Sequence, residues 1–315
     1  MTTSSLAEIL DKQTQVETPA ALIILIDVLR KKHGESINSI LFYGSCLRTG
    51  NIFEGLVDLY LIVDNYRSFY TKKRHAIANW LLPPNVFYIE IPTSKDTIRC
   101  KYAVVSSHDF ERGTQHWFHS YLWGRFTQPV AIVYSKNKTA RKDLLNNLAA
   151  AISKFLSETL PRLPAKGTVR DLWVQSLQLS YHAELRTESG QRAMTLIDDQ
   201  PLFYSSITRA ALPSLPVTLN LSGDAITSLY KTTIPAYQRK FSRITWPARQ
   251  LQGKLLSVLR LLKALFTFEG GLDYIAWKLE RHSGQKVEIP DRVRRYPLIF
   301  IWGLFWRLYR RGIFR

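Results

Sequence analysis

Two polar features in the first half of the chain could together bind phosphate groups. An apolar run ends at Tyr43 and is followed by the dipeptide Gly44-Ser45. The carboxylate of Asp58 comes after twelve more residues. Glycine lets the backbone approach a phosphate closely, and backbone N–H groups and the serine hydroxyl can then bind its oxygens. A carboxylate on the next strand would face the same pocket and could hold Mg²⁺, which bridges triphosphate oxygens and offsets developing charge. This spacing indicates a site for a nucleoside triphosphate.

The elements around these residues are predicted to be strands that alternate with helices. Short apolar runs predict buried strands, and longer amphipathic stretches predict helices. The predicted strands cover residues 39–43, 56–63, 86–91, 102–106 and 129–134. The predicted helices in this half cover residues 19–33, 66–82 and 108–124. We therefore expect an α+β fold, close to α/β, with a mixed sheet that presents the polar residues.

The spacing of Gly44-Ser45 and Asp58 is close to that of the nucleotidyltransferase superfamily. Its signature is Gly-Ser, about a dozen residues and then Asp-x-Asp, whereas this chain has Tyr60 at the second aspartate position. Taken alone, the motif is also compatible with a strand, a turn and a second strand that carries one surface aspartate.

Further residues extend the similarity, in the same order along the chain, across about residues 40–190. They are Tyr43-Gly44-Ser45, Val57-Asp58, Asp64, 85–88, 101–104, Trp117, Tyr121, 124–126, Pro129-Val130, 179–181 and 184–186. In these residues the chain resembles the mitochondrial translocator assembly and maintenance family of phosphatidate cytidylyltransferases, whose metal-binding strand also has a single aspartate. The chain departs from the family pattern at Cys46, Ala103, Trp123 and Glu184.

The resemblance implies an activity and a set of site residues. The activity is Mg²⁺-dependent transfer from CTP to phosphatidate, which yields CDP-diacylglycerol and pyrophosphate in phospholipid biosynthesis. It implies that Asp58 holds the metal and is catalytic together with Lys101 and Glu184. The residues that it assigns to nucleotide binding are Gly44, Ser45, Lys101, Arg125, Tyr181 and Arg186.

Each of these residues also has a purely structural interpretation. Lys101 could be an ordinary lysine near a strand end, and Arg125 could be a cation favoured by a helix C-terminus. Tyr181 and Glu184 lie three residues apart and share one face of a predicted helix, which could simply be solvated. His116 and His119 have the spacing of one helix face but no acidic or thiol neighbour, so a zinc site is not expected.

The remainder of the chain is predicted to form two further regions. Helical patterns at residues 139–160 and 168–188 are followed by residues 213–247, which contain several prolines and are typical of a linking region. Basic amphipathic helices are predicted over 249–268 and 271–282. We therefore expect a nucleotidyltransferase domain (1–138), a mainly helical domain that completes the site (139–235), and a basic aromatic membrane-associating region (236–315).

The chain carries a net charge of +18, and two thirds of this excess lies between Arg239 and Arg315. Such an excess predicts a polyanionic partner. Residues 297–306 are apolar and flanked by arginines, and as a helix they would cover about 15 Å, half of a hydrocarbon core. We expect residues 290–315 to lie on an anionic membrane surface. The alternative is a C-terminal helix that packs as core. The abundance of leucine and isoleucine beside the arginines argues against nucleic acid as a partner, since a stacking platform needs aromatics exposed in a groove.

Two other classes of protein stay open from the sequence. One is an enzyme of the same fold that acts on another acceptor, such as another lipid phosphate or RNA. The other is a membrane-associated module that has lost activity.

The two cysteines form no Cys-x-x-Cys pair, and the N-terminus lacks the apolar stretch of a signal peptide. We therefore expect a peripheral membrane protein on the cytoplasmic or organelle-matrix side, not a secreted one.

Overall fold

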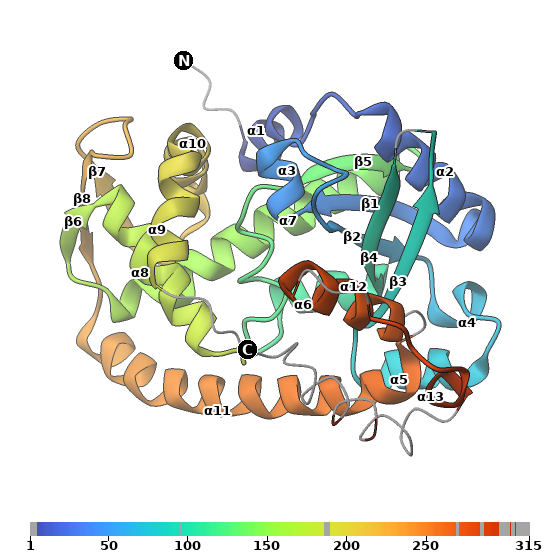
Figure 1. The fold of residues 1–315 in the computed structure, drawn as a ribbon. Helices are drawn as coiled ribbons and strands as arrows, with labels where there is room; N and C mark the ends of the chain where they lie inside the picture. The colour runs from blue at the N-terminus through green and yellow to red at the C-terminus, as the bar shows by residue number, and fades with distance from the viewer. Residues whose placement is uncertain are drawn as a thin grey trace.

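The structure, a computed structural model, confirms the predicted α+β class. The residues that it describes are 5–94, 96–185, 190–268, 271–283 and 287–295, together with Gly303 and Trp306. A five-stranded sheet with its helices forms one half of the molecule, and a helical half with a small second sheet lies beside it (Figure 1). One long helix runs along the lower edge of both halves in this view.

The larger sheet contains all five strands that the sequence predicts in this half. They are β1 (Ile37–Tyr43), β2 (Val57–Val63), β3 (Asn85–Pro92), β4 (Thr97–Ser106) and β5 (Ala131–Ser135). Their order is β3-β4-β2-β1-β5, and only β2 and β4 of these neighbours run parallel. Strand β4 begins earlier than predicted, so Lys101 lies inside it.

The helices of this half connect and cover the strands. They are α1 (Leu6–Gln13), α2 (Ala20–His33), α3 (Ser45–Thr49), α4 (Tyr66–Phe69), α5 (Lys73–Leu81) and α6 (Ser107–Gln115), with a 3₁₀ turn at Gly34–Ser36. The single helix predicted at 66–82 is wrong, because the chain breaks at the buried Tyr70. The helix predicted at 108–124 ends at Gln115, and turns follow, in which the buried Trp123 donates from Nε1 to the Trp117 carbonyl at 3.0 Å.

The second half is mainly helical, with a three-stranded antiparallel sheet of order β6-β8-β7. Its elements are α7 (Lys138–Thr159), β6 (Lys166–Thr168), α8 (Val169–His182), α9 (Gly190–Asp199), α10 (Pro201–Ala211), β7 (Thr218–Leu221) and β8 (Leu229–Thr233), with 3₁₀ turns at Leu160–Arg162 and Leu212–Ser214. The linking region predicted at 213–247 is therefore wrong. It contains β7, β8 and the start of a helix that continues through Pro247.

The two faces of the large sheet contribute to different hydrophobic cores. One face packs against α2 and α5, and its core includes Phe42, Leu59 and Tyr102. The other face, which carries Leu41 and Tyr60, shares a continuous core with α7, α8 and α10. The second face therefore looks towards the helical half. The domain boundaries expected at residues 138 and 235 stay a prediction.

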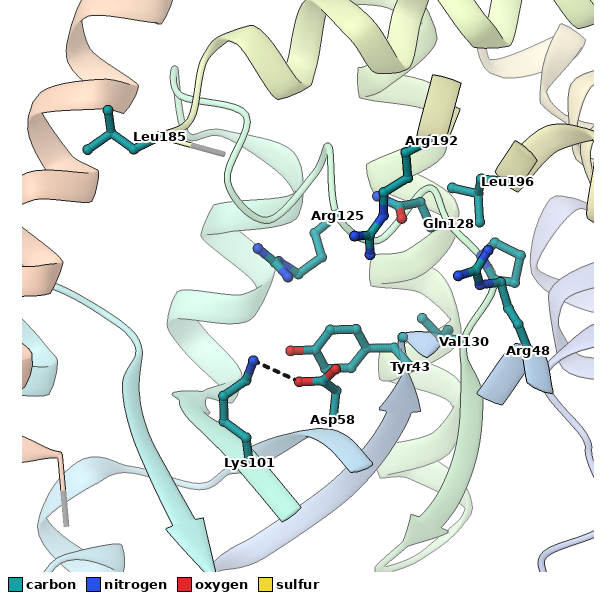
Figure 2. Close-up of a pocket in the computed structure, with 12 residues that line it drawn as sticks. Tyr43, Arg48, Asp58, Lys101, Arg125, Gln128, Val130, Leu185, Arg192 and Leu196 are labelled. Carbon is teal, nitrogen blue, oxygen red and sulfur yellow. Dashed lines mark ion pairs between the residues drawn. The ribbon is translucent and has the colours of Figure 1, made fainter. Parts of the chain in front are cut away.

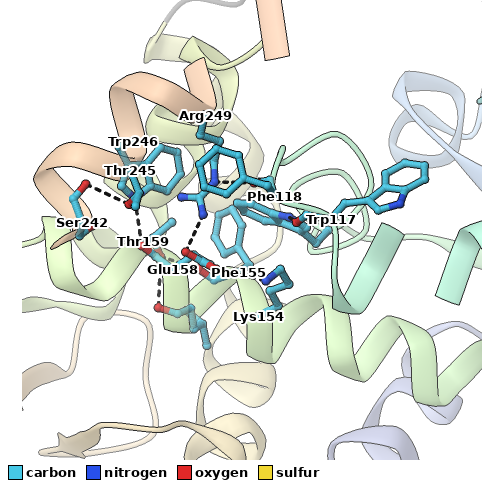
Figure 3. A network of polar contacts seen from close by, with 12 residues as sticks. Trp117, Phe118, Lys154, Phe155, Glu158, Thr159, Ser242, Thr245, Trp246 and Arg249 are labelled. Atoms are coloured by element: carbon cyan, nitrogen blue, oxygen red, sulfur yellow. Dashed lines mark hydrogen bonds and ion pairs between the residues drawn. The ribbon is translucent and has the colours of Figure 1, made fainter. Parts of the chain in front are cut away.

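A 32-residue helix, α11 (Ala236–Thr267), runs along both halves and is followed by α12 (Gly271–Ser283) and α13 (Asp291–Arg295). The buried Arg249 connects α11 to the turns after α6 and to α7. Its Nε donates to the Phe118 carbonyl at 2.6 Å, and its Nη2 lies 2.7 Å from Glu158 Oε2 (Figure 3). Further along, a Cβ on Gly253 would collide with the carbonyl of Ala183. Helix α11 therefore packs directly against the end of α8.

The last turns of α11 bind the chain segment that follows α5. Arg260 Nε donates to the Pro83 carbonyl at 3.0 Å, and Lys263 Nζ donates to the Leu82 and Pro84 carbonyls at 2.5 and 2.7 Å. Burial, and then the neighbouring Arg260, lowers the pKa of Lys263 to about 7. Two cations of the predicted basic amphipathic helix therefore make contacts within the protein.

Candidate active site

The register of the large sheet aligns three of the predicted site residues in one row. Tyr43 on β1 pairs with Asp58 on β2, and Asp58 pairs with Lys101 on β4. Side chains of directly paired residues lie on the same face of a sheet. The apolar residues that flank this row fix the register, because a slip of one residue would turn them out of the core. The row lies on the face that looks towards the helical half.

Asp58 and Lys101 form an ion pair at the floor of this face. Lys101 Nζ lies 2.9 Å from Asp58 Oδ1, and the two side chains are 31% and 18% exposed respectively, so both can be reached by a ligand. Burial alone would lower the pKa of Lys101, but the Asp58 carboxylate together with Tyr43 outweighs burial and raises it. Burial and the same carboxylate raise the pKa of Tyr43. Lys101 therefore stays a cation and Tyr43 a neutral phenol at physiological pH.

Gly44 occupies a position that requires glycine. Its backbone has φ 90° and ψ −161°, a region that is essentially restricted to glycine. A Cβ at this position would also lie 2.7 Å from Oδ2 of Asp58. The turn after β1 therefore brings its backbone directly against the carboxylate.

We expect Gly44→Ala to destabilise the protein by about 1–3 kcal/mol through backbone strain and to lower nucleotide affinity, because the new methyl group displaces Asp58. Gly50→Ala is the matched control: Gly50 also has positive φ, 71°, but nothing lies within 4 Å of a Cβ there. Urea unfolding and KM for the nucleotide measure the two effects. A Gly44→Ala protein with the stability and KM of Gly50→Ala would contradict this assignment.

Arg125 reaches the row from the turns that follow α6. Its guanidinium carbon lies 5.8 Å from the Tyr43 ring centroid and 5.1 Å from that of Tyr121. Nη2 lies 3.6 Å from Oε2 of Glu184, a side chain that is 9% exposed. The Nε atom of Arg125 is buried and has no hydrogen-bond partner among the described residues. Arg125 is thus held by the rings and Glu184, and it retains a donor that the protein leaves unused.

A cavity of about 440 Å³ joins these residues (Figure 2). Of the predicted residues, Gly44, Asp58, Lys101 and Arg125 line it directly. Its other lining residues include Tyr43, Arg48, Gln128 and Arg192. Asp58 is the one carboxylate among the described lining residues, so the cavity is strongly cationic.

The other predicted site residues lie around the cavity rather than in its lining. Ser45 lines a shallow hollow beside it, Glu184 pairs with Arg125, and Tyr181 is buried in the core. Arg186 lies outside the described residues. The assignments of catalytic, nucleotide and metal roles to these residues stay predictions.

Sequence reasoning missed Arg48 and Arg192, two cations of the cavity. Arg48 lies on α3, three residues after Ser45, so helical spacing after the Gly-Ser turn could have drawn attention to it. Arg192 lies on α9, and only the tertiary fold brings it to the cavity. No sequence spacing would have indicated its position.

Fold and cavity together define an α+β protein with a cationic pocket on one face of a mixed sheet. Comparison with known proteins then shows what part of the chain is similar to. Residues 65–197 match the family model described as "Phosphatidate cytidylyltransferase, mitochondrial". This confirms the resemblance seen in the sequence. The matched segment contains Lys101, Arg125, Tyr181 and Glu184, and it begins after Gly44 and Asp58.

A protein of Danio rerio named "Phosphatidate cytidylyltransferase, mitochondrial" is 24% identical over 190 residues. The alignment covers 53% of this chain and 54% of that protein. The chain therefore spans about half the length of the curated relative that it matches.

Proposed function

We propose that this protein is a Mg²⁺-dependent nucleotidyltransferase that transfers the cytidylyl group of CTP to phosphatidate, giving CDP-diacylglycerol and pyrophosphate. The observation that supports this most strongly is the ion pair of Asp58 and Lys101 in a cavity lined by further cations. Such a lining fits a polyphosphate, whose oxygens bind guanidinium and ammonium groups through charge-assisted hydrogen bonds. The choice of CTP and phosphatidate follows the family match and the named relative.

The reaction needs positioning and charge neutralisation rather than a general base. An oxygen of the phosphatidate phosphate forms a bond to the α-phosphorus of CTP, and the bond from that phosphorus to the β-bridging oxygen breaks. The electron pair leaves with pyrophosphate. Because the second pKa of a phosphate monoester is about 6, the attacking group is already a dianion near neutral pH. Lys101 and Arg125 would hold phosphate oxygens in line and stabilise the charge that develops.

The residues present fit a Mg²⁺ ion that depends on the nucleotide for most of its ligands. The described residues contain no cluster of three or more histidine, cysteine, aspartate or glutamate side chains that could hold a metal alone. Mg²⁺ commonly binds through one or two carboxylates plus substrate phosphates, and Asp58 supplies the carboxylate here. When bound, the ion would neutralise charge on the triphosphate.

Helix α11 provides a surface suited to an anionic membrane. Its outward face carries an apolar stripe with the spacing of one helix face. The exposed members of this α11 stripe are Tyr237, Phe241, Ile244, Leu251, Leu255, Leu262 and Phe266. The helix contains no aspartate or glutamate, while Lys240, Arg243 and Lys254 add positive charge. We propose that the stripe inserts its side chains at the acyl boundary and that these cations meet anionic headgroups.

No helix in the described part of the chain is long and apolar enough to cross a bilayer. The membrane contact predicted through residues 290–315 falls mostly outside the described residues. It stays part of this proposal together with the α11 stripe.

Replacing Phe241, Leu251 and Leu255 together by serine is expected to weaken binding to phosphatidate-containing vesicles about 10-fold or more, because each exposed apolar side chain loses its burial in lipid. Vesicle co-sedimentation measures the effect. Leu202→Ser, at an exposed leucine on α10 outside the stripe, is the control and should bind like the wild type. Unchanged binding by the triple variant would remove the stripe from the membrane contact.

The proposed reaction is tested by incubating the full chain with Mg²⁺, CTP and phosphatidate vesicles and measuring pyrophosphate and CDP-lipid. We expect the two products in equal amounts, and neither without phosphatidate. Pyrophosphate release that needs a different acceptor would retain the nucleotidyltransferase and overturn the choice of phosphatidate. Absence of product with all lipid phosphates and RNA would overturn the proposed function.

A further inference from the structure

Helix α5 presents an apolar face to solvent in the sheet half of the molecule. Ile77, Trp80 and Leu81 lie three and four residues apart, so they share one side of the helix. Their exposed fractions are 57%, 69% and 66%. The opposite side carries the buried His75 and Asn79, and Asn79 donates to a carbonyl of β4. The sheet therefore covers only one side of α5 and leaves three large apolar side chains, one of them a tryptophan, in water.

The segment that carries this face has the charge of a surface for anions. Residues 65–89 contain no aspartate or glutamate. They contain four basic side chains, all of them exposed: Arg67, Lys72, Lys73 and Arg74. Cations beside exposed apolar side chains are typical of segments that lie in the interface of an anionic bilayer, where tryptophan is also enriched. An anionic lipid surface therefore matches both the charge and the apolar character of this face.

The apolar face of α5 also forms one wall of a cavity of about 860 Å³ between α4, α5 and α6. Arg67 and Arg112 line the same cavity. Its two carboxylates are engaged by the protein: Asp109 accepts a hydrogen bond from the Tyr66 hydroxyl at 2.7 Å, and Asp64 forms an ion pair at the surface. The cavity thus joins an apolar wall to two cations, which suits a lipid with an anionic headgroup.

The face of α5 adjoins the membrane surface proposed for α11. Lys263 of α11 donates to the carbonyl of Leu82, the residue that follows Leu81. Phe266, within one turn of Lys263, is 64% exposed and belongs to the α11 stripe. Figure 1 shows α5 beside the C-terminal end of α11. Apolar surface therefore continues from the last turns of α11 onto α5.

We propose that the exposed face of α5 is a second membrane anchor, which inserts Ile77, Trp80 and Leu81 at the acyl boundary of an anionic bilayer while the basic side chains of the segment bind headgroups. A single helix on a surface leaves the protein free to rotate about the axis of that helix. A second contact in the sheet half removes this freedom and fixes the direction in which the active-site cavity faces. The anchor goes beyond the proposed function, because it binds neither the nucleotide nor the acceptor.

Fluorescence quenching tests whether Trp80 enters the bilayer. The full chain is mixed with vesicles of phosphatidylcholine and phosphatidylglycerol whose acyl chains carry bromine, which quenches tryptophans that reach the acyl region. Phosphatidylglycerol is anionic but has no phosphate monoester, so it does not act as the proposed acceptor. We expect stronger quenching of the wild type than of Trp80→Phe, which keeps an apolar side chain and should bind equally well. Equal quenching of the two proteins would overturn the proposal.

Co-sedimentation with the same lipids, without bromine, measures what the apolar face contributes to affinity. We expect the variant that combines Trp80→Ser with Leu81→Ser to bind about 10-fold more weakly than the wild type, since both side chains lose their burial in lipid. The matched control combines Leu202→Ser with Leu229→Ser, at two exposed leucines of the helical half, and should bind like the wild type. Thermal unfolding of each variant verifies that it is folded.

A second pair of variants tests the charge of the anchor. Lys73→Gln combined with Arg74→Gln should also weaken binding to the anionic vesicles about 10-fold, because each cation near an anionic surface contributes attraction. Lys31→Gln combined with Lys32→Gln removes the same charge from exposed positions on α2 and should leave binding close to that of the wild type. On vesicles of phosphatidylcholine alone, the two variants and the wild type should bind equally weakly. Equal losses from both pairs on anionic vesicles would overturn the anchor in favour of net charge alone.

The anchor and the proposed α11 contact can fail separately. Quenching of Trp80 that persists at saturating vesicle concentration, in a protein whose α11 stripe carries the three serines, would support the anchor even if α11 does not bind lipid. Vesicle binding that depends on α11 but on none of the α5 positions would overturn the anchor alone. If the serines at Trp80 and Leu81 instead abolish self-association in analytical ultracentrifugation and leave vesicle binding unchanged, the face is a contact between copies of this chain and the proposal fails.

Discussion

Asp58→Asn is expected to lower kcat/KM for CDP-diacylglycerol formation about 1,000-fold, which corresponds to about 4 kcal/mol of transition-state stabilisation. The amide keeps the shape of the side chain but loses the charge that would hold Mg²⁺ and that pairs with Lys101 at 2.9 Å. Because Asp58 is the one carboxylate in the described cavity lining, no neighbour there can replace it. The measurement is steady-state turnover with phosphatidate vesicles.

The matched control for this substitution is Asp64→Asn, six residues further along. Asp64 lies 3.9 Å from Lys136 at the protein surface and lines a different pocket. It should retain the activity of the wild type. Both variants should unfold at similar urea concentrations, because neither aspartate belongs to the hydrophobic core. An Asp58→Asn protein with activity within about threefold of the wild type would contradict the metal assignment.

The second large effect is on stability. Arg249→Met is expected to lower the free energy of unfolding by about 3 kcal/mol, in the range for breaking a network of polar contacts around a buried side chain. Arg249 is 2% exposed, pairs with Glu158, and lies over the rings of Phe118, Trp123 and Trp246, with its guanidinium carbon between 4.6 and 5.3 Å from their centroids (Figure 3). Methionine fills part of the space but leaves the Phe118 carbonyl without its donor.

Urea unfolding followed by circular dichroism measures this loss. Arg243→Met, at an exposed position of the same helix, should change the unfolding free energy by less than about 0.5 kcal/mol. Loss of the Arg249 contacts should also lower activity, because α11 packs through Gly253 against Ala183, next to Glu184. If Arg249→Met were as stable as Arg243→Met, the contacts around Arg249 would not be what holds α11 in place.

The parts of the fold that the sequence predicts well are those where apolar periodicity alone decides the structure. Strands β1 and β2 are continuous apolar runs bounded by polar turns, and α7 has a clear helical period. The predictions failed where tertiary contacts override local signals. Pro247 predicts the end of a helix, yet α11 continues through it. Trp246 and Arg249, on either side of this proline, are both buried against the rest of the protein.

The candidate site shows the same division. Gly44 and Asp58 followed from the spacing of the motif and Lys101 from the family resemblance, and the strand register of the structure brings the three together. Arg125 followed from the family resemblance, whereas its contacts with Tyr121 and Glu184 depend on how the turns after α6 meet the end of α8. Arg192 reaches the cavity from a helix of the other half. Such long-range contacts leave no trace in sequence spacing.

The central claim is that the cavity transfers the cytidylyl group of CTP to a lipid phosphate. The most direct test compares CTP labelled at the α-phosphate with CTP labelled at the γ-phosphate, each incubated with Mg²⁺ and phosphatidate vesicles. We predict that the α-label enters the organic phase as CDP-diacylglycerol and that the γ-label stays in the aqueous phase as pyrophosphate. Transfer of the γ-label to lipid, or retention of both labels in the aqueous phase, would contradict cytidylyl transfer to phosphatidate.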